Sequence, residues 1–162
     1  MKKLIIRPIQ PKDNQVVAQM IREVLVEMGA PKVGTAYEDK TLETMFEAYQ
    51  QKRATYFVVE EDGEIIDSAG IAHLEGEKEN VCELQKMYFS AKARGRGLGS
   101  KMMKICLEFA KEQGFTQCYL ETLPYMKAAQ KLYKRTGFKE IDCRMGSTGH
   151  YSCDVWMLKE LN

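Results

Sequence analysis

The chain has 162 residues, of which 44% are hydrophobic and 29% are charged. That balance is typical of a globular protein and excludes a disordered or collagen-like chain. Lysine and arginine total 24 against 23 aspartates and glutamates, so the chain lacks the basic excess expected of a protein that binds nucleic acid or a membrane surface. We expect one domain over residues 1–162, long enough to bury a core without a disulfide or a metal.

The distribution of apolar residues and cysteines indicates the compartment. No apolar stretch approaches the ~18–20 residues that cross a bilayer, and residues 1–7 contain no long apolar segment followed by a cleavage site. The five cysteines form no C-x-x-C pair and have no ligand spacing with the two histidines. We therefore expect a cytoplasmic protein with reduced thiols, no metal site, and no nucleic-acid or membrane partner.

The N-terminal part of the chain predicts an edge strand and two helices. The strand covers residues 3–9 and is bounded by prolines. Apolar residues then recur at helical spacing over residues 16–28, with Asp13 as the expected N-cap and Gly29 as the expected stop. A second helix is expected over residues 42–49.

The middle of the chain predicts an antiparallel meander. Two apolar runs, residues 56–59 and 64–74, flank Glu61-Asp62-Gly63, which is typical of a hairpin turn. A second turn at residues 75–77 leads to a third strand over residues 81–89.

The remaining segments alternate between helix and strand. A helix follows the third meander strand, and the next strand must then run parallel to it through a right-handed crossover. The elements expected are a helix that contains Met102 and ends at Gly114, a strand at residues 118–120, a helix from Met126 to Gly137, and strands at residues 138–143 and 151–158.

The segment most informative about chemistry is Arg94-Gly95-Arg96-Gly97-Leu98-Gly99-Ser100, between a strand and a helix. Alternating glycines let the backbone turn sharply and approach a ligand, and the helix N-terminus that follows presents unpaired N–H groups. With its two arginines the segment predicts a pyrophosphate cradle, although an ordinary exposed loop at a helix start can have the same composition. The spacing matches neither a Walker A loop nor the dinucleotide-binding fingerprint, which disfavours an ATPase or a nicotinamide dehydrogenase.

The same segment carries a family resemblance. Arg94-x-x-Gly97-x-Gly99 resembles the Gln/Arg-x-x-Gly-x-Gly/Ala signature of the GNAT superfamily of acetyl-CoA-dependent N-acyltransferases. The resemblance implies an α/β fold, in which a mixed, mostly antiparallel sheet of six to seven strands is flanked by about four helices and splayed between its fourth and fifth strands. Further segments are similar to the superfamily in the same order: residues 6–8 with Asp13, residues 83–89, residues 129–138 and residues 156–159.

The resemblance also implies where acetyl-CoA binds. Its pyrophosphate would lie on the backbone amides of residues 95–100, and its pantetheine arm would pair with the strand edge freed by a bulge. Met126 stands where many members carry an asparagine that bonds this arm, so that contact is left open. The residues expected to bind the cofactor are Met87, Tyr88, Phe89, Arg94, Gly95, Arg96, Gly97, Leu98, Gly99 and Ser100.

Two catalytic roles follow from the resemblance. Tyr133 matches the family tyrosine that faces the sulfur of CoA and protonates it as general acid. Glu83 aligns with the position of the general base in histone-type members; a water relay is the equal alternative, and Glu121 is a weaker candidate. A covalent cysteine route is disfavoured because no histidine motif lies near the cysteines in apolar positions.

The sequence constrains the acceptor substrate less than it constrains the cofactor. A primary amine is expected, and the alternatives are a protein lysine or N-terminus, or a non-catalytic sensor that only binds acyl-CoA. Residues 30–37 and the turn at residues 146–151 are candidates for selecting it. His150 and Cys153 are candidates for bordering its pocket, although an ordinary hairpin tip is the simpler explanation of their turn. A homodimer is common in the family. Acidic turns could attract a polyamine, but solvated turns are the commoner explanation; they contain Glu60, Glu61, Asp62, Glu75, Glu77 and Glu79.

Overall fold

The structure is a computed structural model that describes residues 3–161, so both ends of the expected domain lie outside the described residues. One seven-stranded sheet has the order β1-β2-β3-β4-β5-β7-β6. Only β4 and β5 pair in parallel, and the mixed, mostly antiparallel α/β fold is confirmed. The strands are β1 (Leu4–Pro8), β2 (Thr55–Glu61), β3 (Glu64–His73), β4 (Val81–Phe89), β5 (Gln117–Thr122), β6 (Lys139–Ile141) and β7 (Val155–Glu160).

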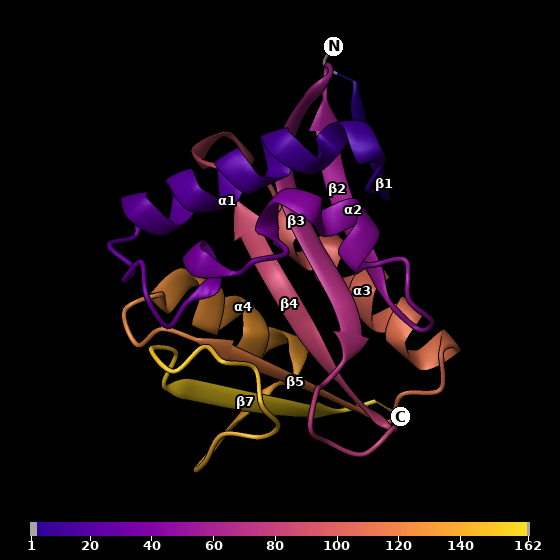
Figure 1. Ribbon diagram of the computed structural model, residues 1–162, viewed down its shortest axis with the longest axis vertical. Coiled ribbons are helices and arrows are strands. Elements are labelled where there is room, and N and C mark those ends of the chain that lie inside the picture. Colours follow the sequence, from indigo (N-terminus) through magenta and orange to yellow (C-terminus); the bar gives the residue numbers. More distant parts are fainter. Residues whose placement is uncertain (1–2, 162) are drawn as a thin grey trace.

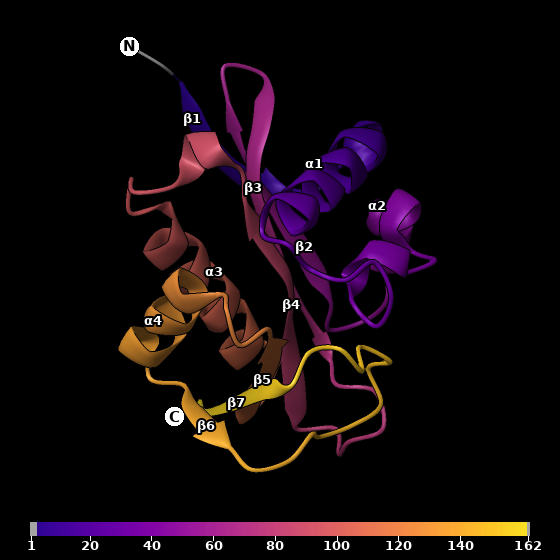
Figure 2. The ribbon, with the colours of Figure 1, turned by 90° about the vertical axis from the view of Figure 1, so that its left-hand side faces the viewer.

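Four α-helices cover the two faces of the sheet, α1 and α2 on one and α3 and α4 on the other (Figure 2). Each face buries a hydrophobic cluster of its own, because the strands alternate their side chains between the faces. Among the described residues no helix has the length and apolar character needed to cross a bilayer. The helices are α1 (Asn14–Glu27), α2 (Met45–Ala48), α3 (Leu98–Glu112) and α4 (Lys127–Thr136).

Three local expectations were wrong in detail. The helix expected over residues 42–49 is a 3₁₀ turn, Leu42–Thr44, followed by the short α2. Asp13 stands at the N-cap position of α1 as expected, but its carboxylate does not bond the helix amides, because it is bound by Arg7 and by the amide of Gln10. The last strand, expected over residues 151–158, begins at Val155 as β7, because the residues before it are held in a loop by contacts described below.

The feature of the sheet that matters most for a site is a bulge in β4. Gly70 pairs with Gln85 and Ser68 with Tyr88, so two residues of β4 stand opposite one of β3. Lys86, in the bulge, has a positive φ of 47°, which is uncommon for a residue with a side chain. Its carbonyl accepts a hydrogen bond of 2.7 Å from the hydroxyl of Tyr56, and this contact holds the bulge in place.

Beyond the bulge, β4 and β5 separate. Their ladder covers only Val81–Glu83 and Gln117–Tyr119, and the two strands diverge from there (Figure 1). The splay expected between the fourth and fifth strands is therefore present. It leaves the β5-facing edge of residues 87–89 without a neighbouring strand.

Candidate active site

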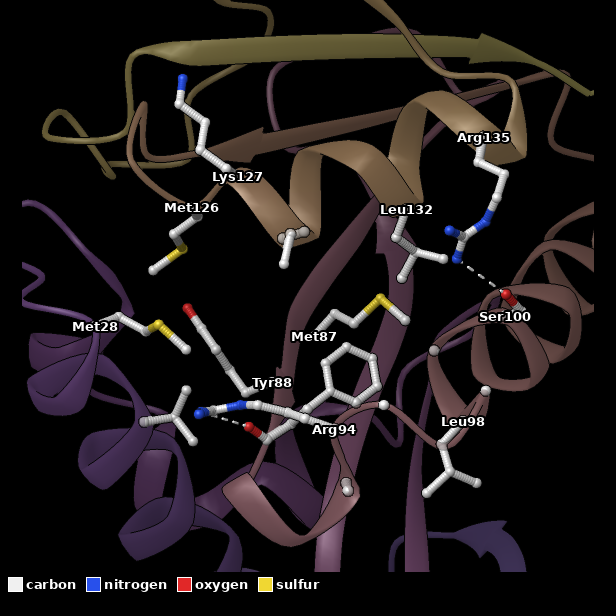
Figure 3. A pocket seen from close by; sticks show the side chains of 18 of the residues that line it. Met28, Met87, Tyr88, Arg94, Leu98, Ser100, Met126, Lys127, Leu132 and Arg135 are labelled. Carbon is white, nitrogen blue, oxygen red and sulfur yellow. Dashed lines mark hydrogen bonds between the residues drawn. The ribbon is translucent and has the colours of Figure 1, made fainter.

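A cavity of about 500 Å³ lies where β4 ends and α3 begins (Figure 3). Arg94 lies at its edge and donates a hydrogen bond of 3.0 Å to the carbonyl of Phe89. Nine of the ten residues expected to bind the cofactor line this cavity: Met87, Tyr88, Phe89, Arg94, Gly95, Gly97, Leu98, Gly99 and Ser100. We call it the cofactor cavity.

The glycine loop explains how backbone amides reach this cavity. Gly95 and Gly97 have φ angles of 73° and 74°, in the left-handed region that costs other residues ~1–2 kcal/mol. Gly97 precedes α3, so the first amides of that helix, from Leu98 onward, have no carbonyl partner within it. No acidic residue lies in this first turn. The loop and helix end therefore form an anion site of the kind that suits a diphosphate.

Arg96 is the exception among the expected residues. Its guanidinium pairs with Glu61, at the end of β2, and donates a hydrogen bond of 3.0 Å to the carbonyl of Lys92. Its side chain does not line the cofactor cavity. The side-chain charge that we expected at the pyrophosphate is compensated by Glu61, and only the Arg96 amide remains a candidate contact.

Two other cationic side chains line the cofactor cavity. Lys127 and Arg135, both on α4, line it, and Arg135 donates to the hydroxyl of Ser100 at 3.4 Å (Figure 3). Sequence reasoning missed both. Their separation of eight residues places them within one broad helix face, but only the packing of α4 beside the start of α3 brings that face to the glycine loop.

A second, polar cavity of about 1030 Å³ lies on the other side of β4. Its walls come from the loop before α2, from β4 and β5, and from residues 142–154 between β6 and β7. Both segments expected to select the acceptor contribute to it, through Ala36, Thr148 and His150. We call it the acceptor cavity.

A third, small cavity of about 70 Å³, which we call the throat, shares lining residues with both larger cavities. Met87 and Met126 are shared with the cofactor cavity, Glu121 and Cys153 with the acceptor cavity, and Tyr88 with both. Figure 3 shows Tyr88 reaching between Met28 and Met126. The three cavities are therefore adjacent to one another along β4.

Tyr133 lines this throat. Its side chain is buried, and its ring packs on Phe138 with the centroids 6.2 Å apart. Burial raises the pKa of the Tyr133 phenol above its usual value, so the hydroxyl keeps its proton at neutral pH. The hydroxyl has no hydrogen-bond partner among residues 3–161 and is open to donate to a ligand.

Glu83 lines the acceptor cavity. Burial raises the pKa of its carboxyl to about 7, although a hydrogen bond of 2.7 Å from the Gln85 amide opposes the shift. A carboxyl of that pKa can accept a proton near neutral pH and release it again.

Glu121, the other carboxylate near the throat, is engaged on both oxygens. Tyr119 and Thr148 donate hydrogen bonds of 2.6 Å to it, and the Arg144 guanidinium lies 3.5 Å away. These contacts also hold residues 142–154 against β5. Glu121 is therefore less suited than Glu83 to accept a substrate proton.

Asp39 ties two walls of the acceptor cavity together. Its carboxylate lies 2.8 Å from Nζ of Lys86 and 2.9 Å from Nε2 of His150. Burial opposes its ionisation, but His150 and Lys86 outweigh burial and hold the pKa of Asp39 below its usual value. His150 thus lies at the acceptor cavity and not at the solvated hairpin tip that was the simpler expectation.

The cysteines give no sign of nucleophilic chemistry. Cys82, Cys106 and Cys118 are buried away from the three cavities, and all five thiols are free. Burial raises the pKa of Cys153, in the throat, to about 12, so it is protonated at neutral pH. Within residues 3–161 no three metal-ligating side chains come together.

Comparisons with known proteins agree on one family. A model described as the acetyltransferase (GNAT) family matches residues 19–138. The chain is 42% identical over 158 residues to a protein of Escherichia coli K12 named "Uncharacterized N-acetyltransferase YjgM", covering 97% of this chain and 95% of the relative. It is 32% identical over 126 residues to human N-acetylaspartate synthetase, covering 74% of this chain and 39% of that protein.

Solved structures show the same fold. A GNAT-family acetyltransferase of Staphylococcus aureus Mu50 superposes with a TM-score of 0.83 at 18% identity, covering 99% of this chain and 100% of that one. The yncA protein of Salmonella typhimurium, solved with its cofactor acetyl-CoA, gives a TM-score of 0.78 at 16% identity, covering 99% and 95%.

Proposed function

Because this chain belongs to the GNAT family and is an acetyl-CoA-dependent acyltransferase, we propose that it transfers the acetyl group to a primary amine by direct attack in a ternary complex. The observation that supports this most is that the throat, which Tyr133 lines, shares residues with both the cofactor cavity and the acceptor cavity. Such a junction suits two substrates that must meet directly. We propose that the chain forms one N-acetyltransferase domain and acts in the cytoplasm. That it forms a homodimer stays a prediction.

Two features of the cofactor cavity suit acetyl-CoA. Its glycine loop offers unpaired amides for the pyrophosphate, and Lys127 and Arg135 supply positive charge around it, whereas the Arg94 guanidinium is paired with Glu27. The free edge of residues 87–89 offers backbone groups to the peptide-like pantetheine arm. When bound, acetyl-CoA supplies an activated thioester, and amides freed by the bulge would polarise its carbonyl.

The chain's own groups then move two protons. Glu83 accepts a proton from the acceptor ammonium, directly or through a water, because an alkylamine has a pKa of ~10.4 and attacks only when neutral. The amine nitrogen attacks the thioester carbon, and the carbon–sulfur bond breaks. Tyr133 donates its phenol proton to the departing sulfur, and its phenolate is reprotonated through solvent as the acylated nitrogen releases its second proton.

The test of the function is a thiol-release assay with acetyl-CoA and a panel of small amines, amino acids, peptides and proteins. We expect release of free CoA with at least one small amine or amino acid. Release with peptides or proteins alone would favour the protein acetyltransferase. Binding of acetyl-CoA without release across the whole panel would contradict catalysis and favour the sensor.

The anion site predicts a specific loss on Gly97→Val. A Cβ on Gly97 would meet no protein atom within 4 Å, so the cost is backbone strain of ~1–2 kcal/mol at a positive φ, plus a methyl-bearing carbon where the diphosphate should lie. We expect the Kd for acetyl-CoA to rise by at least ~10-fold, measured by calorimetry. Gly114→Val is the matched control, since Gly114 also has a positive φ and open space but lies at the far end of α3. Equal Kd values for the two variants would contradict the site.

The acid role predicts that Tyr133→Phe lowers kcat by ~100-fold or more. The substitution removes the only free hydroxyl donor on α4 at the throat and leaves the ring to pack on Phe138. The Kd for acetyl-CoA should stay unchanged, which separates a chemical loss from a binding loss. A wild-type kcat with an accepted amine would remove Tyr133 from the mechanism.

A further inference from the structure

Three side chains in the acceptor cavity form one hydrogen-bonded chain. Tyr49, which ends α2, donates its hydroxyl proton to Oε1 of Gln85. Gln85 in turn donates from Nε2 to Oε1 of Glu83 at 2.7 Å. Tyr49 and Gln85 belong to segments 36 residues apart in sequence, and all three residues line the acceptor cavity. Tyr49 and Gln85 take no part in the two proton transfers proposed for Glu83 and Tyr133.

The direction of the chain is set by Tyr49. A glutamine side chain can present either its oxygen or its NH₂ group to a neighbour. Burial raises the pKa of Tyr49 well above 10, so its hydroxyl keeps a proton to donate. Because the Tyr49 hydroxyl donates its hydrogen bond to Oε1 of Gln85, the Nε2 group of Gln85 faces Glu83. An ionised Glu83 carboxylate can only accept hydrogen bonds, so the donor Nε2 is the right partner for it.

Tyr49 is itself firmly placed. Its side chain is buried, and its ring lies 5.0 Å from that of Tyr56, measured between centroids. Both rings pack over Gly70, where a Cβ would come within 3.0 Å of Tyr49 and 2.4 Å of Tyr56. The Tyr56 hydroxyl holds the β4 bulge at Lys86. The chain of hydrogen bonds is therefore anchored in the same packing that opens β4.

Glu83 has one oxygen bound and one open. Gln85 is its one hydrogen-bond partner among residues 3–161, at Oε1. The other oxygen, Oε2, has no such partner and is not among the fully buried unpaired atoms. Gln85 thus fixes the rotation of the carboxylate and leaves one oxygen for the substrate.

We infer that Gln85, oriented by Tyr49, is a positioning residue that holds Glu83 with Oε2 directed to the acceptor amine. This inference rests on the proposed function. In the step concerned, an N–H bond of the ammonium breaks and an O–H bond forms at Oε2 of Glu83, while the electron pair stays on nitrogen for attack. The bond from Gln85 favours the ionised carboxylate and so also sets the pH at which Glu83 becomes active.

Other charged groups face Glu83 and must be held constant in any test. Glu121, on β5, raises its pKa, whereas Lys86, on β4, and His150, between β6 and β7, lower it. Lys86 and His150 are both bound to Asp39. The neutral side chains of Tyr49, Cys118, Tyr119 and Cys153 also lie near Glu83. None of these contacts involves the Gln85 amide except that of Tyr49.

The experiment compares Gln85→Leu, Tyr49→Phe and the double variant by the pH dependence of kcat/KM. Without the Gln85 bond the pKa of Glu83 should rise, so the acid limb should move to higher pH by about one unit. Tyr49→Phe should move it in the same direction by less, since the Gln85 amide becomes free to turn. The double variant should match Gln85→Leu, because both act through one bond.

A readout that needs no turnover accompanies the kinetics. The carboxyl ¹³C resonance of Glu83, assigned by its loss in Glu83→Gln, should titrate at higher pH in Gln85→Leu and Tyr49→Phe than in the wild type. The control is Gln19→Leu, which removes a glutamine that donates to Glu23 at 3.1 Å on the exposed face of α1. It should move neither the resonance of Glu83 nor the acid limb.

The outcomes separate this inference from the proposed function. If Glu83→Gln keeps the wild-type acid limb, the base assignment itself is wrong. If Glu83→Gln abolishes that limb but Gln85→Leu and Tyr49→Phe leave both the limb and the resonance of Glu83 in place, the base stands and the positioning role is overturned. A shift in both readouts supports the positioning role, and the resonance reports it even in a variant with low activity.

Discussion

Glu83→Gln is expected to lower kcat/KM at neutral pH by about 10²–10⁴-fold, the range of a general base. The substitution keeps the shape of the side chain and its place in the acceptor cavity but removes the group that accepts the amine proton. Because Glu83 does not line the cofactor cavity, the Kd for acetyl-CoA should be unchanged. Steady-state kinetics with an accepted amine, together with calorimetry for acetyl-CoA, measure both quantities.

The pH profile gives the sharper form of this prediction. Burial raises the pKa of Glu83 to about 7, and the ionised form is the active one, so wild-type activity should rise through pH 7 toward a plateau. Glutamine does not titrate, and the rise should be absent in the variant. Glu108→Gln, on the exposed side of α3, is the control and should keep the wild-type profile. A residual profile in Glu83→Gln with the same acid limb would assign the base to another group.

Loss of activity in Glu83→Gln should not arise from unfolding. When a carboxyl has a higher pKa in the folded state than in the unfolded chain, the free energy of unfolding of the protein falls as pH rises between the two values. For Glu83 these values are 4.5 and about 7. The glutamine variant escapes that loss, so its free energy of unfolding above pH 7 should equal or exceed that of the wild type.

Asp67→Asn is expected to raise the free energy of unfolding in alkaline solution. Asp67 lies on β3 opposite Phe89 of β4, is 0% exposed, and has no hydrogen-bond partner on either carboxylate oxygen among the described residues. Burial raises its pKa to about 8, and the backbone N–H of Ser68 opposes this shift without reversing it. Ionising a buried carboxyl is costly when so little of its lost hydration is replaced.

The sign of the pH dependence follows from proton binding. Between pH 4 and pH 8 the unfolded chain has lost the Asp67 proton and the folded protein keeps it, so wild-type stability falls as pH rises. Each pH unit in this window is worth ~1.4 kcal/mol. We expect the stability difference between Asp67→Asn and the wild type to grow by about 2–4 kcal/mol from pH 5 to pH 8.

Urea unfolding of both proteins at several pH values measures this difference. Asp142→Asn, at an exposed position after β6, is the control, and its free energy of unfolding should change with pH in parallel with that of the wild type. Parallel curves for Asp67→Asn and the wild type would show that Asp67 ionises freely in the folded protein. A carboxyl kept at such a cost directly beside the β4 strand that lines the cofactor cavity fits the rule that strained or unsatisfied groups gather near functional sites.

Features built from neighbouring residues could be predicted from the sequence. The hairpin at residues 61–63 and the helix ends at Gly29, Gly114 and Gly137 are present as expected, and each of these glycines has a positive φ. The reason is that turn and stop signals act over a few residues, through backbone conformations that glycine adopts at little cost. The same holds for the glycine loop before α3, which lines the cofactor cavity.

Features that join distant segments could not be predicted in this way. The arginines of the glycine loop look equivalent in sequence, and each pairs with a distant glutamate, Arg94 with Glu27 and Arg96 with Glu61, yet only Arg94 lines the cofactor cavity. His150 and Asp39 meet across 111 positions of the chain. Periodicity shows which face of an element is buried but does not show which side chain it meets there.

The sequence by itself determined the order of the elements, the family and the position of the phosphate-binding loop, because these depend on short-range patterns and motif spacing. Only the tertiary structure decided which cations line the cofactor cavity, how Tyr49 and Gln85 reach Glu83, and why the pKa values of Glu83 and Asp67 lie near neutrality. Those properties depend on removal of water by everything packed around a group. That packing is complete only when segments far apart in the chain have come together.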